Sequence, residues 1–229
     1  MGGVNVKNTM VERGLQIIAP HPCFGCGKVG AILCDDCKYD ITHEPFVGCI
    51  LCGKPNAFGI CRIHDSPIDR AFTIGTRSGV LEDVINQLKF HRVKGAARPL
   101  AELLHEQLPS FSENVEIVPI PTVRSHVRQR GYDQVELIVQ HFASLRTMPV
   151  CHYLERMTNA TQHVVGKDER LVQAEKAFSL KECEGIYGKT VLLIDDIVTT
   201  GATLQSAATL LKNAGATVWV ATLAYQPLD

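Results

Sequence analysis

One stretch of the sequence decides the fold: Val191-Leu192-Leu193-Ile194-Asp195-Asp196-Ile197-Val198-Thr199-Thr200-Gly201-Ala202-Thr203. An apolar run is followed by two adjacent carboxylates and then by a hydroxyl-rich turn with one glycine. The run predicts a buried strand over 190–194, and the residues after the turn predict a helix over 202–214 that ends at Gly215. A strand that leads into a helix is the repeating unit of an α/β sheet, and ligands of such sheets bind at the carboxyl ends of the strands.

The chemistry of this turn favours phosphate binding. Its backbone N–H groups, its threonine hydroxyls and the start of the helix can together hold a phosphate, and Gly201 lets the backbone approach it closely. Asp195 and Asp196 can accept hydrogen bonds from sugar hydroxyls or reach Mg²⁺ through water. The alternative is that the acids only end a strand and the turn only caps a helix. Because two charges at the end of a buried strand are costly, we favour the ligand site.

The rest of the C-terminal two-thirds alternates in the same way. Apolar patterns predict strands over 70–76, 115–120, 150–154 and 217–224, and helices that carry Val80 to Leu88, Leu100 to Leu108 and Val135 to Phe142 on their inner faces. The alternation predicts a mostly parallel sheet flanked by helices. A polar stretch over 156–175 is long enough to be a functional loop.

Cysteine is the unusual residue of the composition, with seven of the nine between Cys23 and Cys61. The first four form the set Cys23-x2-Cys26-x7-Cys34-x2-Cys37, and the next ligands form the set Cys49-x2-Cys52-x8-Cys61-x2-His64. Pairs two residues apart suit two tetrahedral, structural Zn²⁺ ions, because four protein ligands leave no open position for catalysis. Sequential and crossed pairing of the four ligand pairs both fit the spacing. Cys151 and Cys183 are expected to be bystanders.

Length and composition divide the chain into three parts. The 229 residues are enough for one ordinary domain and a small appendage. We assign 1–20 to an N-terminal lead-in, 21–66 to a double zinc-ribbon-like module and 67–229 to the α/β domain. The net charge of −1 means that any polyanion must be bound by a local cluster. No apolar run reaches the ~20 residues that span a bilayer, and no secretion signal is present, so we expect a cytoplasmic protein without membrane insertion.

Two clusters of basic residues are candidates for binding phosphates. Arg124, Arg128 and Arg130 follow the strand over 115–120, and Arg128 and Arg130 are the better candidates because Gly131 favours a turn directly after them. A second cluster consists of Lys89, His91, Arg92, Lys94 and Arg98, with no acid over 86–98. Beside a zinc module and Phe90 it would suit single-stranded nucleic acid, but a solvated helix face explains it equally well.

The thirteen residues that open this section resemble the phosphoribosyl-pyrophosphate motif of type I phosphoribosyltransferases. The resemblance implies that the two acids contact the 2′- and 3′-hydroxyls of a ribose. It also implies that Thr199, Thr200, Gly201, Ala202 and Thr203 hold its 5′-phosphate. The fold it implies is a type I phosphoribosyltransferase-like α/β domain, here with a small N-terminal zinc-binding module.

The wider pattern, roughly from Cys23 to Ala224, is similar to the ComF family of competence-associated, phosphoribosyltransferase-like proteins. The resemblance rests on Arg128-x-Arg130-Gly131-Tyr132-Asp133-Gln134 beside the family's R-x-R-G-F-N-Q, on Gln162, Lys167, Arg170 and Phe178 beside Q-x4-R-x2-R-x7-F, and on Leu88-Lys89-Phe90. Asp133 replaces Asn, Gln173 stands where Asn is usual, and His64 replaces a cysteine. By analogy, Gln162 and Lys167 bind substrate from a lid over 156–175.

Two functions follow as hypotheses. In the first, phosphoribosyl pyrophosphate with Mg²⁺ lies on the acid pair and the turn, Arg128 and Arg130 meet its pyrophosphate, and an acceptor that the sequence does not identify displaces that pyrophosphate. In the second, the fold retains a sugar-phosphate site without turnover, and the protein binds single-stranded nucleic acid or regulates DNA uptake with other uptake proteins.

Overall fold

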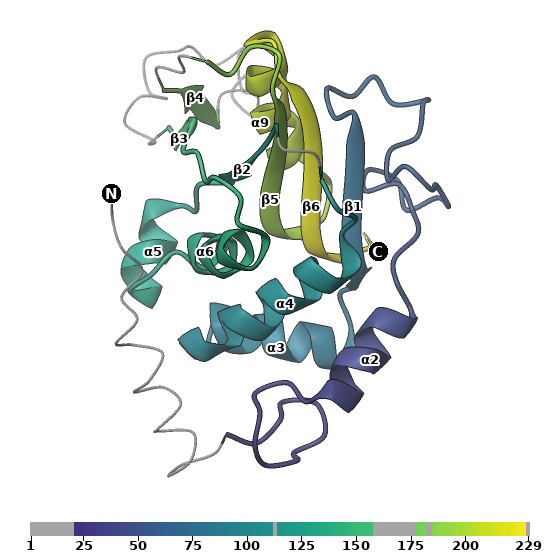
Figure 1. Cartoon of the computed structure of the whole chain (residues 1–229), viewed down its shortest axis with the longest axis vertical. Helices are drawn as coiled ribbons and strands as arrows, with labels where there is room; N and C mark the ends of the chain where they lie inside the picture. The colour runs from purple at the N-terminus through teal and green to yellow at the C-terminus, as the bar shows by residue number, and fades with distance from the viewer. Residues whose placement is uncertain (1–20, 112–113, 158–176, 182–184, 228–229) are drawn as a thin grey trace, which may run out of the picture.

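The computed structural model describes residues 21–111, 114–157, 177–181 and 185–227. Its centre is a parallel sheet of four strands in the order β1-β6-β5-β2 (Figure 1). The strands are β1 (Arg70–Thr76), β6 (Thr217–Tyr225), β5 (Thr190–Val198) and β2 (Val115–Pro119). A separate antiparallel pair is formed by β3 (Leu154–Arg156) and β4 (Phe178–Leu180). The predicted parallel α/β fold is therefore confirmed.

Helices cover both faces of this sheet (Figure 1). They are α2 (Asp35–His43), α3 (Gly79–Lys89), the short 3₁₀ helix η1 (Lys94–Ala96), α4 (Ala97–Gln107), α5 (Arg124–Arg130), α6 (Gln134–Arg146) and α9 (Ala202–Asn213). Apolar residues of α3, α4 and α6 pack with Leu192 and Ile194 on one face, and those of α9 pack with Val191 and Leu193 on the other. Successive strand residues point to opposite faces, so β5 is buried on both sides.

The cysteine-rich segment belongs to the same packed body. Cys23, Ile32, Cys37 and Ile41 lie in the apolar cluster of α3 and α4, and Ile50 lies in the cluster of α9. The segment thus packs on both faces of the domain, while its sequence boundaries at 21 and 66 stay a prediction.

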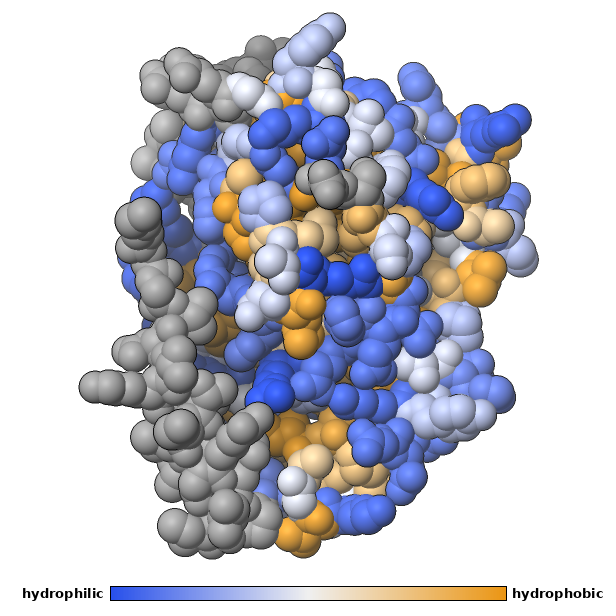
Figure 2. Space-filling view, in the orientation of Figure 1, coloured by the Kyte–Doolittle hydropathy of each residue, from blue (hydrophilic) through white to orange (hydrophobic). Residues whose placement is uncertain are grey.

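The front of the molecule over α3 and α4 is mostly hydrophilic, and apolar side chains gather over residues 45–65 (Figure 2). Within the described ranges, no helix is long and apolar enough to cross a membrane.

Several elements differ from the sequence-based expectation. The strand predicted over 150–154 lies instead at Leu154–Arg156 as β3 and pairs with β4, while Val150 makes an isolated bridge to Ile117. The strand predicted to end at Ile194 continues to Val198, because Asp195 and Ile197 still pair with β6, which is longer than β2. The segment after β2, for which no helix was predicted, contains α5, which ends at Gly131 in the left-handed conformation (φ 84°). The cysteine module, for which no helix was predicted either, contains α2, whose buried face consists of Cys37 and Ile41.

Candidate functional site

The acid pair lies inside β5, at the edge of the sheet where the strands end. β2 ends at Pro119, which pairs with Ile194, so this side of β5 has no neighbouring strand from Asp195 onward. Asp196 is 5% exposed and points to two partners. Lys89 Nζ donates to its Oδ1 at 3.0 Å, and Gln134 Nε2 donates to its Oδ2 at 3.1 Å. Asp196 is thus a fixed, fully partnered carboxylate.

Asp195 is half-buried and is held differently. Its Oδ1 accepts the backbone N–H of Asp196 at 2.8 Å. Burial, followed by the negative charge of Asp196, raises the pKa of Asp195 to about 8, although that hydrogen bond and the charges of Lys89 and Arg156 act in the opposite direction. A carboxyl group with such a pKa is destabilised in its charged form, and a cation or hydroxyl-bearing ligand would relieve it.

The turn after β5 has the geometry of an anion site. Thr199 and Thr200 are exposed, and Gly201 precedes α9 in the left-handed conformation (φ 73°). The Thr200 hydroxyl accepts the backbone N–H of Ala202 at 3.3 Å. The start of α9, whose first N–H groups have no partner within the helix, therefore lies at the same edge of the sheet as the acid pair, and such a helix start can bind an anion.

Arg130 is connected to the acid pair through Gln134. Arg130 Nη1 donates to Gln134 Oε1 at 2.6 Å, and the amide nitrogen of Gln134 donates to Asp196.

The contacts of Asp133 explain why an aspartate can replace the asparagine that is usual at this position. Its carboxylate caps α6 by accepting the backbone N–H groups of Val135 and Glu136, and it also accepts hydrogen bonds from the backbone N–H and the hydroxyl of Thr122. Every one of these partners is a donor, so a carboxylate suits the position and no neutral amide is needed.

Parts of the two basic clusters of the sequence form one surface, while Lys89, Arg98 and Arg124 are paired with Asp196, Glu102 and Glu155. Arg92 donates to the carbonyl of Gln129 at 2.6 Å, and the Arg130 guanidinium lies 5.8 Å from the centre of the Phe90 ring. Phe90 is 62% exposed. Arg128 is exposed on the same helix as Arg130. This surface, defined by Phe90, Arg92, Lys94, Arg128 and Arg130, is referred to below as the basic surface.

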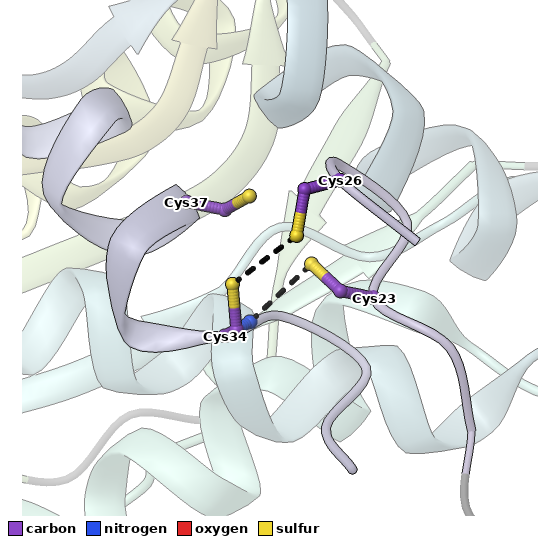
Figure 3. Close-up of side chains that lie close together, drawn as sticks. All are labelled: Cys23, Cys26, Cys34 and Cys37. Carbon is purple, nitrogen blue, oxygen red and sulfur yellow. Dashed lines mark hydrogen bonds between the residues drawn. The ribbon is translucent and has the colours of Figure 1, made fainter. Parts of the chain in front are cut away.

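The first cysteine set converges on one point. The sulfurs of Cys23, Cys26, Cys34 and Cys37 lie within 4.8 Å of one another and point inward (Figure 3). The Cys26 and Cys34 sulfurs are 3.6 Å apart, close to the ~3.8 Å expected between thiolates of a tetrahedral zinc site. The set can hold a metal ion, and its members pair sequentially.

The second set consists of Cys49, Cys52, Cys61 and His64, whose ligand atoms also lie within 4.8 Å of one another. His64 Nε2 is buried and has no hydrogen-bond partner among the described residues. A buried imidazole nitrogen next to three sulfurs fits a metal ligand, because burial without a partner is otherwise costly. His64 is therefore placed with the ligands, as its spacing predicts.

Backbone N–H groups favour thiolates in both sets. Burial opposes ionisation of Cys23, but N–H groups of Cys26, Cys34 and Gly25 outweigh it and lower the pKa of Cys23 to about 6. The pKa of Cys49 is lowered in the same way, against burial, by N–H groups of Leu51, Cys61 and Cys52. Thiolate is the form that binds metal. Burial and neighbouring thiols raise the pKa of Cys61 to about 11, so a metal would have to displace its proton.

The structure brings together most of the residues predicted from sequence. Asp195, Asp196, the turn over 199–203 and Arg130 lie at one edge, with Arg128 exposed beside them. Gln162 and Lys167 lie outside the described residues. Sequence reasoning missed Lys89 as a partner of the acids, since it was grouped with the nucleic-acid cluster, and it gave Gln134 no role. Arg156, near enough to act on Asp195, was also missed.

Comparison with known protein families shows to which class of protein this chain belongs. The phosphoribosyl transferase domain matches residues 97–228, which is more than half of the chain, so the chain belongs to this family. Among solved structures, the glutamine phosphoribosylpyrophosphate amidotransferase from B. subtilis is 20% identical, with a TM-score of 0.42, over 57% of this chain and 26% of its own.

Curated relatives narrow the family. Competence protein ComFC of Bacillus subtilis is 29% identical over 80% of this chain and 79% of its own length. Competence protein F of Haemophilus influenzae is 26% identical over 80% and 85%, and DNA utilization protein YhgH of Escherichia coli O6:H1 is 28% identical over 86% of each chain. Within the phosphoribosyl transferase class, this similarity to competence and DNA utilization proteins supports the resemblance to the ComF family.

We predict that Lys89→Met destabilises the protein by about 3 kcal/mol, because it leaves the buried carboxylate of Asp196 without its cation. The control Lys54→Met, at an exposed lysine, should change the free energy of unfolding by less than about 0.5 kcal/mol. Urea denaturation followed by circular dichroism measures both. Equal stability of the two variants would show that the Lys89–Asp196 pair does not support the site.

We also predict two zinc ions per chain. Cys34→Ser and Cys52→Ser should each lower the measured stoichiometry from two to one, since each removes a ligand from a different set. Cys151→Ser, outside both sets, should leave it at two. Elemental analysis of protein dialysed against buffer gives the count, and two ions in either ligand variant would contradict the assignment.

Proposed function

We propose that this protein binds phosphoribosyl pyrophosphate together with Mg²⁺ at the carboxyl edge of β5 and β6. Asp195 and Asp196 accept the ribose hydroxyls, and the turn of Thr199, Thr200, Gly201, Ala202 and Thr203 holds the 5′-phosphate. The observation that carries the proposal is the acid pair itself. One carboxylate is fixed by Lys89 and Gln134, while the other keeps a raised pKa next to an open anion site.

The positions of the arginines support a pyrophosphate on the same ligand. Arg130 is two hydrogen bonds away from Asp196, and Arg128 lies two residues earlier on α5. Guanidinium groups keep their charge and recognise phosphate oxygens in pairs. We assign the pyrophosphate to Arg128 and Arg130, and further substrate contacts to Gln162 and Lys167.

The reaction that such a site supports is displacement at the anomeric carbon of the ribose, with release of pyrophosphate. Bound Mg²⁺ would neutralise charge on the pyrophosphate as it leaves. The protein would contribute the orientation of the sugar through the acid pair and a positive environment for the leaving group through the two arginines. In the cell we propose that the protein supports DNA uptake, as the names of the competence relatives suggest.

A second candidate function, binding of single-stranded nucleic acid, is favoured by the basic surface. Lys94 lies 5.2 Å above the Tyr132 ring, and Arg92 is bonded to α5, so residues from two separate clusters form one positive area around an exposed aromatic ring. Charge that follows a backbone and a ring that stacks on bases are the two requirements for single-strand binding. The two functions overlap, because Arg128 and Arg130 belong to the basic surface and are also the residues to which we assign the pyrophosphate.

We predict that combining Asp195→Asn with Asp196→Asn weakens binding of phosphoribosyl pyrophosphate and Mg²⁺ by at least about 100-fold. The change removes two charged acceptors, each of which contributes roughly 1.5–3 kcal/mol. Isothermal titration calorimetry measures the affinity. Asp83→Asn, at an exposed acid of α3, serves as the control and should bind as the wild type does.

Unchanged calorimetry in the double variant would refute the site assignment. A wild-type protein that shows no binding at all would refute the proposed function. If binding is found, a screen of nucleobases and nucleic acids for pyrophosphate release identifies the acceptor.

For the second candidate, we predict that Arg92→Glu with Lys94→Glu strongly weakens binding of a fluorescent single-stranded oligonucleotide in anisotropy titrations. Removal of two phosphate contacts from the wild type should reduce the slope of log affinity against log salt by about 1.4. The matched control is Lys54→Glu with Arg62→Glu, which makes the same charge change at exposed positions of the cysteine module. If both double variants bind equally weakly, net charge and not the basic surface governs binding.

A further inference from the structure

The second metal-ligand set is in direct contact with the proposed phosphate-binding turn. Leu51 lies between Cys49 and Cys52, and its side chain fills the space next to Gly201. A Cβ atom at Gly201 would be 2.3 Å from Leu51 Cδ2, and the carbonyl oxygen of Ile50 is 3.8 Å from the same point. The backbone of the turn therefore rests on the side chain of Leu51.

The segment that carries Leu51 is fixed on its other sides as well. Ile50 is completely buried, and it lies in the apolar cluster that contains Val198 and Leu204 at the two ends of the turn. Its N–H donates to the carbonyl of Gly59 at 2.9 Å. Gly59 in turn is in close contact with β1, since a Cβ there would be 2.1 Å from the carbonyl oxygen of Ala71.

A third contact joins the same module to β6, whose end lies next to the turn. The ring of Phe46 stacks on that of Tyr225, with 4.4 Å between centres, and Tyr225 pairs with Val198 at the end of β5. A cavity of about 540 Å³ opens between these rings and the Leu51–Lys54 segment. Packed interiors transmit displacements. A shift of the Cys49–Cys52 loop would therefore move Leu51 and, through Leu51, the backbone of the turn at Gly201.

Among the residues that the structure describes, the first set makes no comparable contact with the turn. Its Gly25 lies against Val80, at the beginning of α3, and its Cys23 and Cys37 join the cluster under α3 and α4. Val80 is nine residues before Lys89, which corresponds to roughly 13 Å along the helix. Loss of a metal ion from the first set therefore acts on a helix end that is remote from the turn.

We propose that Leu51 is a positioning residue through which the metal ion of the Cys49, Cys52, Cys61 and His64 set fixes the phosphate-binding turn. Metal and sugar phosphate then bind with positive coupling. Coupling is reciprocal: if the metal strengthens binding of the sugar phosphate, the sugar phosphate must strengthen binding of that metal ion by the same factor. The first set should show no such coupling. This inference rests on the proposed function, because it needs a sugar phosphate at the turn.

The test measures zinc release. Protein with two zinc ions is mixed with a chromogenic chelator, with and without phosphoribosyl pyrophosphate and Mg²⁺, and release is followed by absorbance. We expect one of the two ions to be released at least about fivefold more slowly when the ligand is present. Pyrophosphate alone at the same concentration controls for chelation. The variant Cys26→Ser with Cys34→Ser, which keeps only the second set, should retain the protection.

A matched pair of variants separates Leu51 from its surroundings. Leu51 and Ile63 occupy equivalent positions, each directly before the second ligand of a pair, but Ile63 is 75% exposed. Leu51→Ala should keep two zinc ions, bind phosphoribosyl pyrophosphate about tenfold more weakly and lose the protection. Ile63→Ala should behave as the wild type does.

The outcomes distinguish this inference from the function on which it rests. Wild-type protein that binds phosphoribosyl pyrophosphate but releases both ions at unchanged rates overturns the coupling and leaves the proposed function intact. The coupling is also overturned if Leu51→Ala and Ile63→Ala bind the ligand equally well. Absence of ligand binding in the wild type overturns the proposed function, and the inference with it. The wild-type release rates decide the question even if a variant fails to fold.

Discussion

Two carboxylates next to each other at the end of a buried strand repel each other. The rest of this structure depends on the groups that offset this repulsion. Asp196 receives a cation from α3 and an amide from α6, while Asp195 receives only a backbone N–H and keeps a raised pKa. Four parallel strands place this pair at an edge where β2 has already ended. The domain thus fixes Asp196 through two partners and leaves Asp195 with one, and both carboxylates keep acceptor sites for the proposed ligand.

The cysteine module packs on the α/β domain beside the site. It is too poor in apolar residues to fold on a core of its own, and metal ligation together with packing on the α/β domain would replace that core. Its first set lies against α3, the helix that ends in Lys89, and its second lies against Gly201. Closed metal sites of this kind perform no chemistry. Their value here would be geometric: the second set supports the turn, and the first supports the beginning of α3, which is remote from the turn.

Local patterns in the sequence predicted much of this correctly. Continuous apolar runs predicted the strands of the parallel sheet, and 3.6-residue periodicity predicted α3, α4 and α6. The spacing of cysteine and histidine pairs predicted the two groups of four metal ligands. The partners of the acids could not be found in that way, because Lys89 is 107 residues from Asp196 and Gln134 is 62 residues away. Lys89 looked like part of a solvated basic run. Only the position of α3 against β5 shows that it is turned toward the carboxylate.

Titration of the Asp195 carboxyl carbon by ¹³C NMR, assigned by comparison with Asp195→Asn, tests the central claim most directly. The account predicts a pKa of about 8 in the ligand-free protein, because burial and Asp196 oppose its ionisation, and a lower pKa when phosphoribosyl pyrophosphate and Mg²⁺ bind. A pKa near the ordinary value of about 4 in the free protein would contradict it. Asp195 would then ionise as a solvated carboxylate does, and the site would hold no destabilised charge for a ligand to relieve.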